Sequence, residues 1–152
     1  MKTEILFPEV ANLCGDLMNV TYLRQCCPEM EVVETGLKDR PAFLDGGVDL
    51  VYVGSATERG LQLMVKALAP YRAELERYVD GGGLMLATGN ALDALGEYVV
   101  IDGKRAFDGL GILKTHAEYH MMKRHNSFLL GSFQDMEIVG FKSLFGHTYP
   151  DD

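Results

Sequence analysis

Long apolar runs are missing from this sequence. No stretch approaches the roughly 20 apolar residues that a transmembrane helix needs. The first residues, Met-Lys-Thr-Glu-Ile-Leu-Phe-Pro, turn polar too soon for a signal peptide. Three cysteines, two of them adjacent, do not make a disulfide framework. We therefore expect a cytoplasmic protein that does not enter a membrane.

Basic residues are also scarce. The chain has 14 Lys and Arg against 22 Asp and Glu, which gives a formal net charge of −8. This charge argues against nonspecific binding to nucleic acid or to an anionic membrane, and it favours solubility or a basic partner surface. Repeats, low-complexity tracts and linkers are absent as well, so we expect residues 1–152 to form one domain.

The first two thirds of the chain alternate between strand and helix patterns. The expected strands are 4–7, 30–34, 48–53 and 84–87, and the expected helices follow Asp16 and cover 61–69 and 71–79. This order predicts a three-layer α/β fold with a mostly parallel sheet flanked by helices. We expect Asp16 to cap its helix by accepting a free backbone N–H. The apolar run 84–87 predicts a strand covered on both faces.

The last third has a different texture. Four short strands are expected at 98–101, 110–114, 128–133 and 136–141, separated by Asp-Gly and other glycine-containing turns. We expect these strands to pair antiparallel and to add to one edge of the parallel core.

A sharp turn at Thr88, Gly89 and Asn90 separates the fourth strand from a helix that begins at Ala91. A strand, a tight turn and a helix form the backbone of a nucleophile elbow. Gly89 stands at its point, where a positive φ is often required. Backbone N–H groups from Ser55 or its neighbours and from Asn90 could converge there as an oxyanion hole. The alternative is a pair of ordinary strand-to-helix turns, which the pattern alone favours.

Six motifs in register cover almost the whole chain. They are N-L-C-G-D-L-M-N at 12–19 followed by L-R at 23–24, V-G-S-A-T-E-R at 53–59, A-T-G-N-A-L-D-A-L-G at 87–96, D-G-L-G-I-L at 108–113, G-F at 140–141, and G-H-T-Y at 146–149. In these motifs the sequence resembles class I glutamine amidotransferase-like domains of the cobyric acid synthase type. It is most similar to the amidotransferase subunits of lipid II isoglutaminyl synthase.

The departures from this family pattern concern its catalytic residues. The family's nucleophilic cysteine falls on Gly89, and its glycine-rich loop is kept only as Gly54 followed by Ser55 and Ala56. Family members continue past the last motif to a catalytic histidine, so the resemblance implies a domain shortened at its C-terminus. It implies no catalytic residue in this chain. The ligand-binding positions that it implies are Asn12, Asp16, Gly54, Ser55 and Asn90.

Cysteine and histidine offer no substitute chemistry. We expect Cys14, Cys26 and Cys27 to be buried structural thiols. His116 and His120, four residues apart, could hold a metal if they lay on a helix. Their flanking strands favour a solvated loop or a connection ordered by a partner. We therefore expect no metal and no cofactor.

Two function hypotheses follow from the resemblance, and they leave open whether the chain is an enzyme. The first is a degenerate homologue without glutaminase activity, which acts as a binding or partner subunit. Its expected partners are an amide ligase or Mur-ligase-like subunit, and glutamine or a related small molecule. The alternative is an amidotransferase component that delivers ammonia to an amide ligase in cobalamin or cell-wall precursor amidation, with catalytic residues removed or supplied by another chain. Because Leu144-Phe145 has no obvious cover, we also expect a homodimer or hetero-complex through this end.

Overall fold

The computed structural model describes residues 1–151. Its centre is a four-stranded sheet with the strand order β2-β1-β3-β4, in which every neighbouring pair is parallel. The strands are β1 (Lys2–Leu6), β2 (Glu31–Thr35), β3 (Leu50–Val53) and β4 (Leu84–Ala87). The predicted parallel α/β core is thus confirmed.

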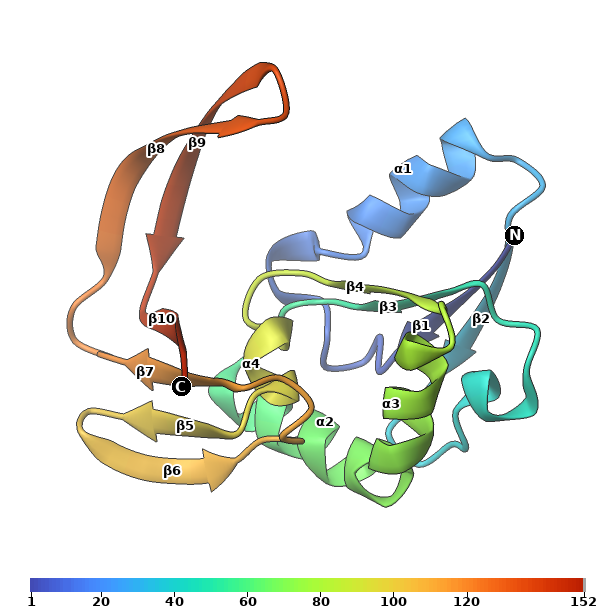
Figure 1. The fold of residues 1–152 in the computed structure, drawn as a ribbon, viewed down its shortest axis with the longest axis horizontal. Coiled ribbons are helices and arrows are strands. Elements are labelled where there is room, and N and C mark those ends of the chain that lie inside the picture. Colours follow the sequence, from blue (N-terminus) through green and yellow to red (C-terminus); the bar gives the residue numbers. More distant parts are fainter. Residues whose placement is uncertain (152) are drawn as a thin grey trace.

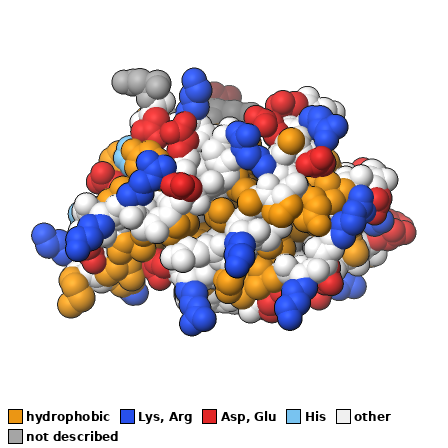
Figure 2. Space-filling view, turned by 90° about the horizontal axis from the view of Figure 1, so that it is seen from below, with side chains coloured by type: hydrophobic (Ala, Val, Ile, Leu, Met, Phe, Trp, Pro, Cys, Tyr) orange, Lys and Arg blue, Asp and Glu red, His pale blue; other side chains and the backbone are white. Residues whose placement is uncertain are grey.

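Helices cover the two faces of this sheet (Figure 1). One face packs against α1 (Met18–Cys26), and the other against α2 (Glu58–Leu68) and α3 (Arg72–Asp80). Three short 3-10 turns connect these elements, η1 (Leu13–Gly15), η2 (Ala42–Asp45) and η3 (Ala69–Tyr71). None of the helices within residues 1–151 is long and apolar enough to cross a bilayer. The face seen from below in Figure 1 mixes both signs of charge with small apolar patches (Figure 2).

Helix α2 shows how the sequence positions these layers. The Thr57 hydroxyl accepts a hydrogen bond from the backbone N–H of Gly60, and this cap fixes where the helix begins. Leu61, Met64 and Leu68 repeat at helical spacing and are almost fully buried against the sheet. Pro70 lies in the 3-10 turn η3 and separates α2 from α3, as the sequence predicts.

The last third forms two further sheets, not an extension of the first. One has the order β10-β7-β5-β6, and the other is the hairpin β8-β9, which extends away from the parallel sheet (Figure 1). The strands are β5 (Tyr98–Ile101), β6 (Lys104–Asp108), β7 (Thr115–Tyr119), β8 (His125–Phe133), β9 (Met136–Leu144) and β10 (Gly146–Pro150). The expected addition to the edge of the parallel core was therefore wrong. The antiparallel pairing is confirmed, except that β5 and β7 are parallel.

The prediction of a strand at 110–114 was also wrong, because the backbone N–H groups of this segment donate hydrogen bonds to the end of a helix. Gly111 has a φ of +62°. The N–H groups of Ile112 and Leu113 both donate to the carbonyl of Leu95 at the end of α4 (Ala91–Leu95). These bonds hold the segment against the helix and leave it no strand partner.

Strand β4 is not covered on both faces, contrary to the prediction. It lies at the edge of the sheet, and Leu84 is 61% exposed. Leu86 pairs in register with Tyr52 and so shares its face, but α1 packs over Tyr52 and Ile5 and does not bury Leu86. The apolar run therefore predicted the strand correctly, but the burial of its side chains depends on how far α1 extends over the sheet.

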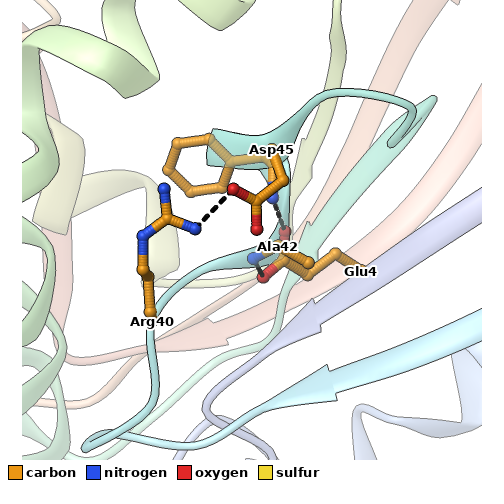
Figure 3. Close-up of polar contacts among 5 residues, drawn as sticks. Glu4, Arg40, Ala42 and Asp45 are labelled. Carbon is orange, nitrogen blue, oxygen red and sulfur yellow. Dashed lines mark hydrogen bonds and ion pairs between the residues drawn. The ribbon is translucent and has the colours of Figure 1, made fainter.

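A buried carboxylate ties the sheet to its first long connection. Glu4 on β1 accepts a hydrogen bond from the Thr35 hydroxyl at 2.5 Å. It also accepts from the backbone N–H groups of Ala42 at 2.6 Å (Figure 3) and Phe43 at 2.7 Å. The exposed ion pair of Arg40 and Asp45 spans the same turn and adds little stability. Glu4 thus holds η2 against the sheet from inside the protein.

Replacing this carboxylate tests its importance. We expect Glu4→Gln to lower the free energy of unfolding by about 1–3 kcal/mol, because an amide NH₂ would face a buried N–H. Urea denaturation of this variant and of Glu34→Gln, an exposed control on β2, measures the effect. Equal midpoints for the two variants would contradict it.

Candidate functional site

The turn after β4 has the predicted elbow conformation. Thr88 N–H donates to the carbonyl of Val53 at 3.0 Å, so the turn begins at the carboxyl end of the sheet. Gly89 has a φ of +54°, in the left-handed region that favours glycine. Asn90 then stands at the N-cap of α4. The expected positive φ at Gly89 is confirmed.

The point of this elbow is filled by a neighbouring side chain. A Cβ atom placed on Gly89 would lie 2.7 Å from the Cβ of Ser55, well inside contact distance. The loop after β3 and the elbow therefore meet, as expected for two loops on one rim of the sheet. A side chain at position 89 would require Ser55 to move.

Asn90 joins the same two loops by a pair of hydrogen bonds. Its Oδ1 accepts from the N–H of Ala56 at 3.0 Å, and its Nδ2 donates to the carbonyl of Ala56 at 2.8 Å. Both polar groups of the amide side chain are thus used inside the protein. The side chain fixes the spacing between the loops.

Asp16 is the third member of the site and connects most of its parts. Its Oδ2 accepts hydrogen bonds from the N–H of Ser55 and from the Thr88 hydroxyl, both at 2.6 Å. Its Oδ1 accepts from the side-chain amide of Asn19 at 2.8 Å. The predicted helix cap was wrong: Leu17 precedes α1 as its N-cap, and no side chain caps that end. The carboxylate turns instead toward the two rim loops.

These hydrogen bonds change the acidity of Asp16. Partial burial is the largest single influence and raises the pKa, but the bonds from Ser55, Thr88 and Asn19 together bring it below the usual value. Asp16 is therefore a carboxylate at neutral pH and a weak base. The Thr88 hydroxyl that donates to it gains little activation as a nucleophile.

Three side chains of this network, those of Tyr52, Thr88 and Asn19, were not among the predicted site residues. Tyr52, the one aromatic residue of β3, is fully buried; its hydroxyl donates to the carbonyl of Asp16 at 2.7 Å and lies 3.1 Å from the hydroxyl of Thr88. A buried phenol needs a polar partner, so the tyrosine within an aliphatic strand was the available signal. For Thr88, the sequence provided no indication that Asp16 would be its acceptor.

The predicted oxyanion hole is only partly available. The N–H of Ser55 is bonded to Asp16 and that of Ala56 to Asn90, so neither is free to bind a ligand. Within residues 1–151, the N–H groups of Gly89 and Asn90 donate no hydrogen bond. Donors therefore remain on the elbow side of the site, while the loop side is closed.

Gly54 and Asn12 stabilise the loops behind this site. A Cβ at Gly54 would lie 2.1 Å from the carbonyl oxygen of Ala11, so only glycine allows the two backbones to approach. Asn12 accepts a hydrogen bond from the N–H of Leu17 at 3.0 Å, within its own turn. Of the five predicted residues, Asp16, Ser55 and Asn90 meet at the elbow; ligand binding by any of the five stays a prediction.

A second buried carboxylate links α4 to the sheet formed by the last third of the chain. Asp93 accepts hydrogen bonds from the Tyr119 hydroxyl at 2.5 Å and from the Thr148 hydroxyl at 2.6 Å. Burial raises its pKa, and these two bonds oppose the rise. The elbow helix is thereby attached to β7 and β10.

The cysteines and histidines lie elsewhere than expected. All three cysteines are exposed, so the buried-thiol prediction was wrong; of the residues of α1, only Val20 is buried. His116 lies in strand β7 instead of a solvated loop, stacked on Tyr98 with its Nδ1 2.6 Å from Asp151. The described part of the chain contains no cluster of three side chains suited to a metal ion.

Substitution of Gly89 tests how tightly the elbow is filled. Gly89→Ala should lower the free energy of unfolding by about 1–2 kcal/mol for the positive φ and by a further 1–3 kcal/mol, roughly, for the overlap with Ser55. Gly47→Ala is the matched control, because Gly47 also has a positive φ but no atom near its Cβ position. Adding Ser55→Gly should reduce the cost of Gly89→Ala to that of the control. Chemical denaturation of these three variants and of Ser55→Gly alone measures the costs, and an unchanged cost in the Ser55→Gly background would contradict the close packing.

The lowered pKa of Asp16 predicts how stability depends on pH. A carboxyl group whose pKa is lower in the folded state stabilises the fold above its unfolded pKa of about 4, and this contribution is lost as the pH falls through the folded value. The stability difference between the wild type and Asp16→Asn should therefore shrink between about pH 6 and pH 2. Asp80→Asn, which changes an exposed carboxylate at the end of α3, is the control. Parallel curves for Asp16→Asn and the wild type would refute this role.

Comparison with known proteins finds similarity to one subunit of a synthase. No protein-family model matches the chain. Over 145 residues it is 28% identical to the lipid II isoglutaminyl synthase (glutamine-hydrolyzing) subunit GatD of Staphylococcus aureus strain N315. The alignment covers 92% of this chain and 58% of the relative, so the chain spans little more than half of that protein's length. This similarity supports a relationship to amidotransferase subunits of that kind.

Proposed function

We propose that this protein is a glutamine amidotransferase-like subunit without glutaminase activity, which acts through a partner amide ligase. The observation that carries the proposal is the elbow at Gly89, which has no side chain and no room for one beside Ser55. Amide hydrolysis of this type requires a nucleophile that forms a covalent intermediate and a base that manages its proton.

The other groups at the elbow are poor replacements for a nucleophile. The Thr88 hydroxyl donates a hydrogen bond to Asp16, whose pKa is lowered. Such a carboxylate is a weak base, so the threonine oxygen stays a neutral alcohol. The side chains of Asp16 and Asn90 are occupied by bonds inside the protein. Because these two side chains already have hydrogen-bond partners inside the protein, a role through the outer surface is better supported than a role in binding glutamine.

The choice of partner rests on the relative. Its name describes one subunit of a synthase that forms an isoglutaminyl product, which is an amide. We propose that the partner of this protein is likewise an amide ligase of the Mur-ligase-like kind. A net charge of −8 favours a basic surface on that partner.

A second candidate function keeps part of the chemistry. The relative is named as glutamine-hydrolysing, and the N–H groups of Gly89 and Asn90 donate no hydrogen bond within residues 1–151. In this alternative the chain provides half of an amidotransferase site, and another chain provides the nucleophile and base. Ammonia would then be released from glutamine only in the complex.

The isolated chain should release no ammonia from glutamine. NMR of glutamine labelled with ¹⁵N in its amide group measures this directly, with buffer as the reference. The controls are Thr88→Val, which removes the elbow hydroxyl while keeping the side-chain shape, and Cys14→Ser. Ammonia release that survives a chelator and disappears in either variant would overturn the absence of catalysis.

The partner ligase separates the two candidate functions. If the chain is non-catalytic, the complex should amidate its substrate with ammonium chloride and fail with glutamine as nitrogen donor. Product formation from glutamine would support the alternative. A ligase that does not bind this chain at micromolar concentration would rule out both.

A further inference from the structure

The β8-β9 hairpin is the most exposed part of the chain and has no role in the candidate site. Its strands pair along nine residues each, from His125 opposite Leu144 to Phe133 opposite Met136. It extends between β7 and β10, away from the parallel sheet (Figure 1). An isolated two-stranded hairpin is at best marginally stable in water. This hairpin therefore needs a surface to pack on.

One face of the hairpin is a continuous apolar patch. The paired residues Phe128 and Phe141 lie beside Leu130 and Val139 on the same face, here called the phenylalanine face. Their exposed fractions are 85%, 62%, 76% and 74%. Four such side chains expose an area on the order of 400 Å², which is typical of an interaction site.

The opposite face is less suited to a flat contact. Gly131 and Gly140 interrupt it at the centre, between Leu129 and Ile138. Ile138 is 43% exposed, compared with 74% for its neighbour Val139. Val139 and Ile138 are thus neighbours on one strand whose side chains lie on opposite faces of the hairpin.

Charge is distributed along the hairpin with opposite signs at its ends. Asp135 and Glu137 lie at the turn, whereas Lys123 and Arg124 lie at the base, just before β8. Nine strand residues separate these ends by roughly 30 Å, several times the Debye length at physiological salt. Two hairpins side by side in the same direction would bring like charges together, whereas an antiparallel arrangement brings opposite charges together.

We propose that two copies of this protein dimerise by packing their phenylalanine faces together, with the hairpins antiparallel. A two-fold axis between the faces brings together eight apolar side chains, four from each copy. It also places Glu137 of each copy over the polar end of the facing hairpin, where Asn126 and Ser143 share the phenylalanine face. The hairpin's own polarity selects a second copy as its occupant, because each end finds its complement in the same sequence.

The base of the hairpin is held firmly enough for such a contact. Tyr119 closes β7 just before the hairpin, and Thr148 lies in β10 just after it. Both donate hydrogen bonds to the buried Asp93. The strands that flank the hairpin are therefore held against the elbow helix, which limits the entropy lost on association.

The oligomeric state of the full chain tests this proposal. Multi-angle light scattering after gel filtration should give a dimer mass at 50 µM, roughly, for the wild type and a monomer mass for Val139→Lys, a loss of at least about tenfold in affinity. Ile138→Lys, with the same charge on the opposite face of the same strand, should remain dimeric. Thermal unfolding of each variant checks that it is folded.

Charge reversal tests the antiparallel arrangement. Reversing the turn with Asp135→Lys and Glu137→Lys should weaken the dimer, and adding Lys123→Glu and Arg124→Glu at the base should strengthen it again. A monomeric wild type, an equal loss in Ile138→Lys, or no recovery in the fourfold variant would overturn the proposal. A monomer that binds the amide ligase through Val139 would instead assign this face to the other subunit and also overturn it. These masses do not depend on whether glutamine is hydrolysed.

Discussion

The carboxylate of Asp16 is the constraint on which the candidate site depends. One oxygen receives the Ser55 N–H and the Thr88 hydroxyl, so a single group joins the loops that follow β1, β3 and β4. These loops are far apart in the sequence and meet only at the carboxyl ends of parallel strands. The hydrogen bonds outweigh the effect of burial and keep the group ionised.

The same bonds explain how the elbow keeps its backbone conformation without a side chain at its point. Asn90 fixes the distance between the loops, and Ser55 fills the space where a side chain at position 89 would begin. The backbone conformation of the elbow is therefore stabilised by contacts inside the protein. Asp93 extends this rigidity from the elbow helix to the base of the β8-β9 hairpin. What remains available to other molecules is the pair of N–H groups of Gly89 and Asn90 and the exposed surface, above all that hairpin.

Local signals were sufficient where a segment's structure depends on its own residues. The strands at 84–87 and 98–101 were predicted with their observed bounds, and the positive φ of Gly89 followed from a strand, a tight turn and a helix in sequence. Prediction failed where the structure of a segment depends on contacts with residues distant in the sequence. The segment 110–114 is apolar enough for a strand, but its N–H groups bond to Leu95. Cys26 in α1 is exposed because that helix buries only Val20.

The sequence by itself determined the order of strands and helices in the first two thirds of the chain, the parallel core and the absence of a cysteine at the elbow, because periodicity, turn residues and residue identity are local properties. It also determined that the loops after β3 and β4 would share one rim, since parallel strands end together. Only the tertiary structure decided that Asp16 bonds to Ser55 and Thr88 instead of capping α1, because acceptors compete for donors across 39 and 72 residues of sequence. The exposure of β4 and of the β8-β9 hairpin likewise depends on how far neighbouring elements extend over them, which no local pattern encodes.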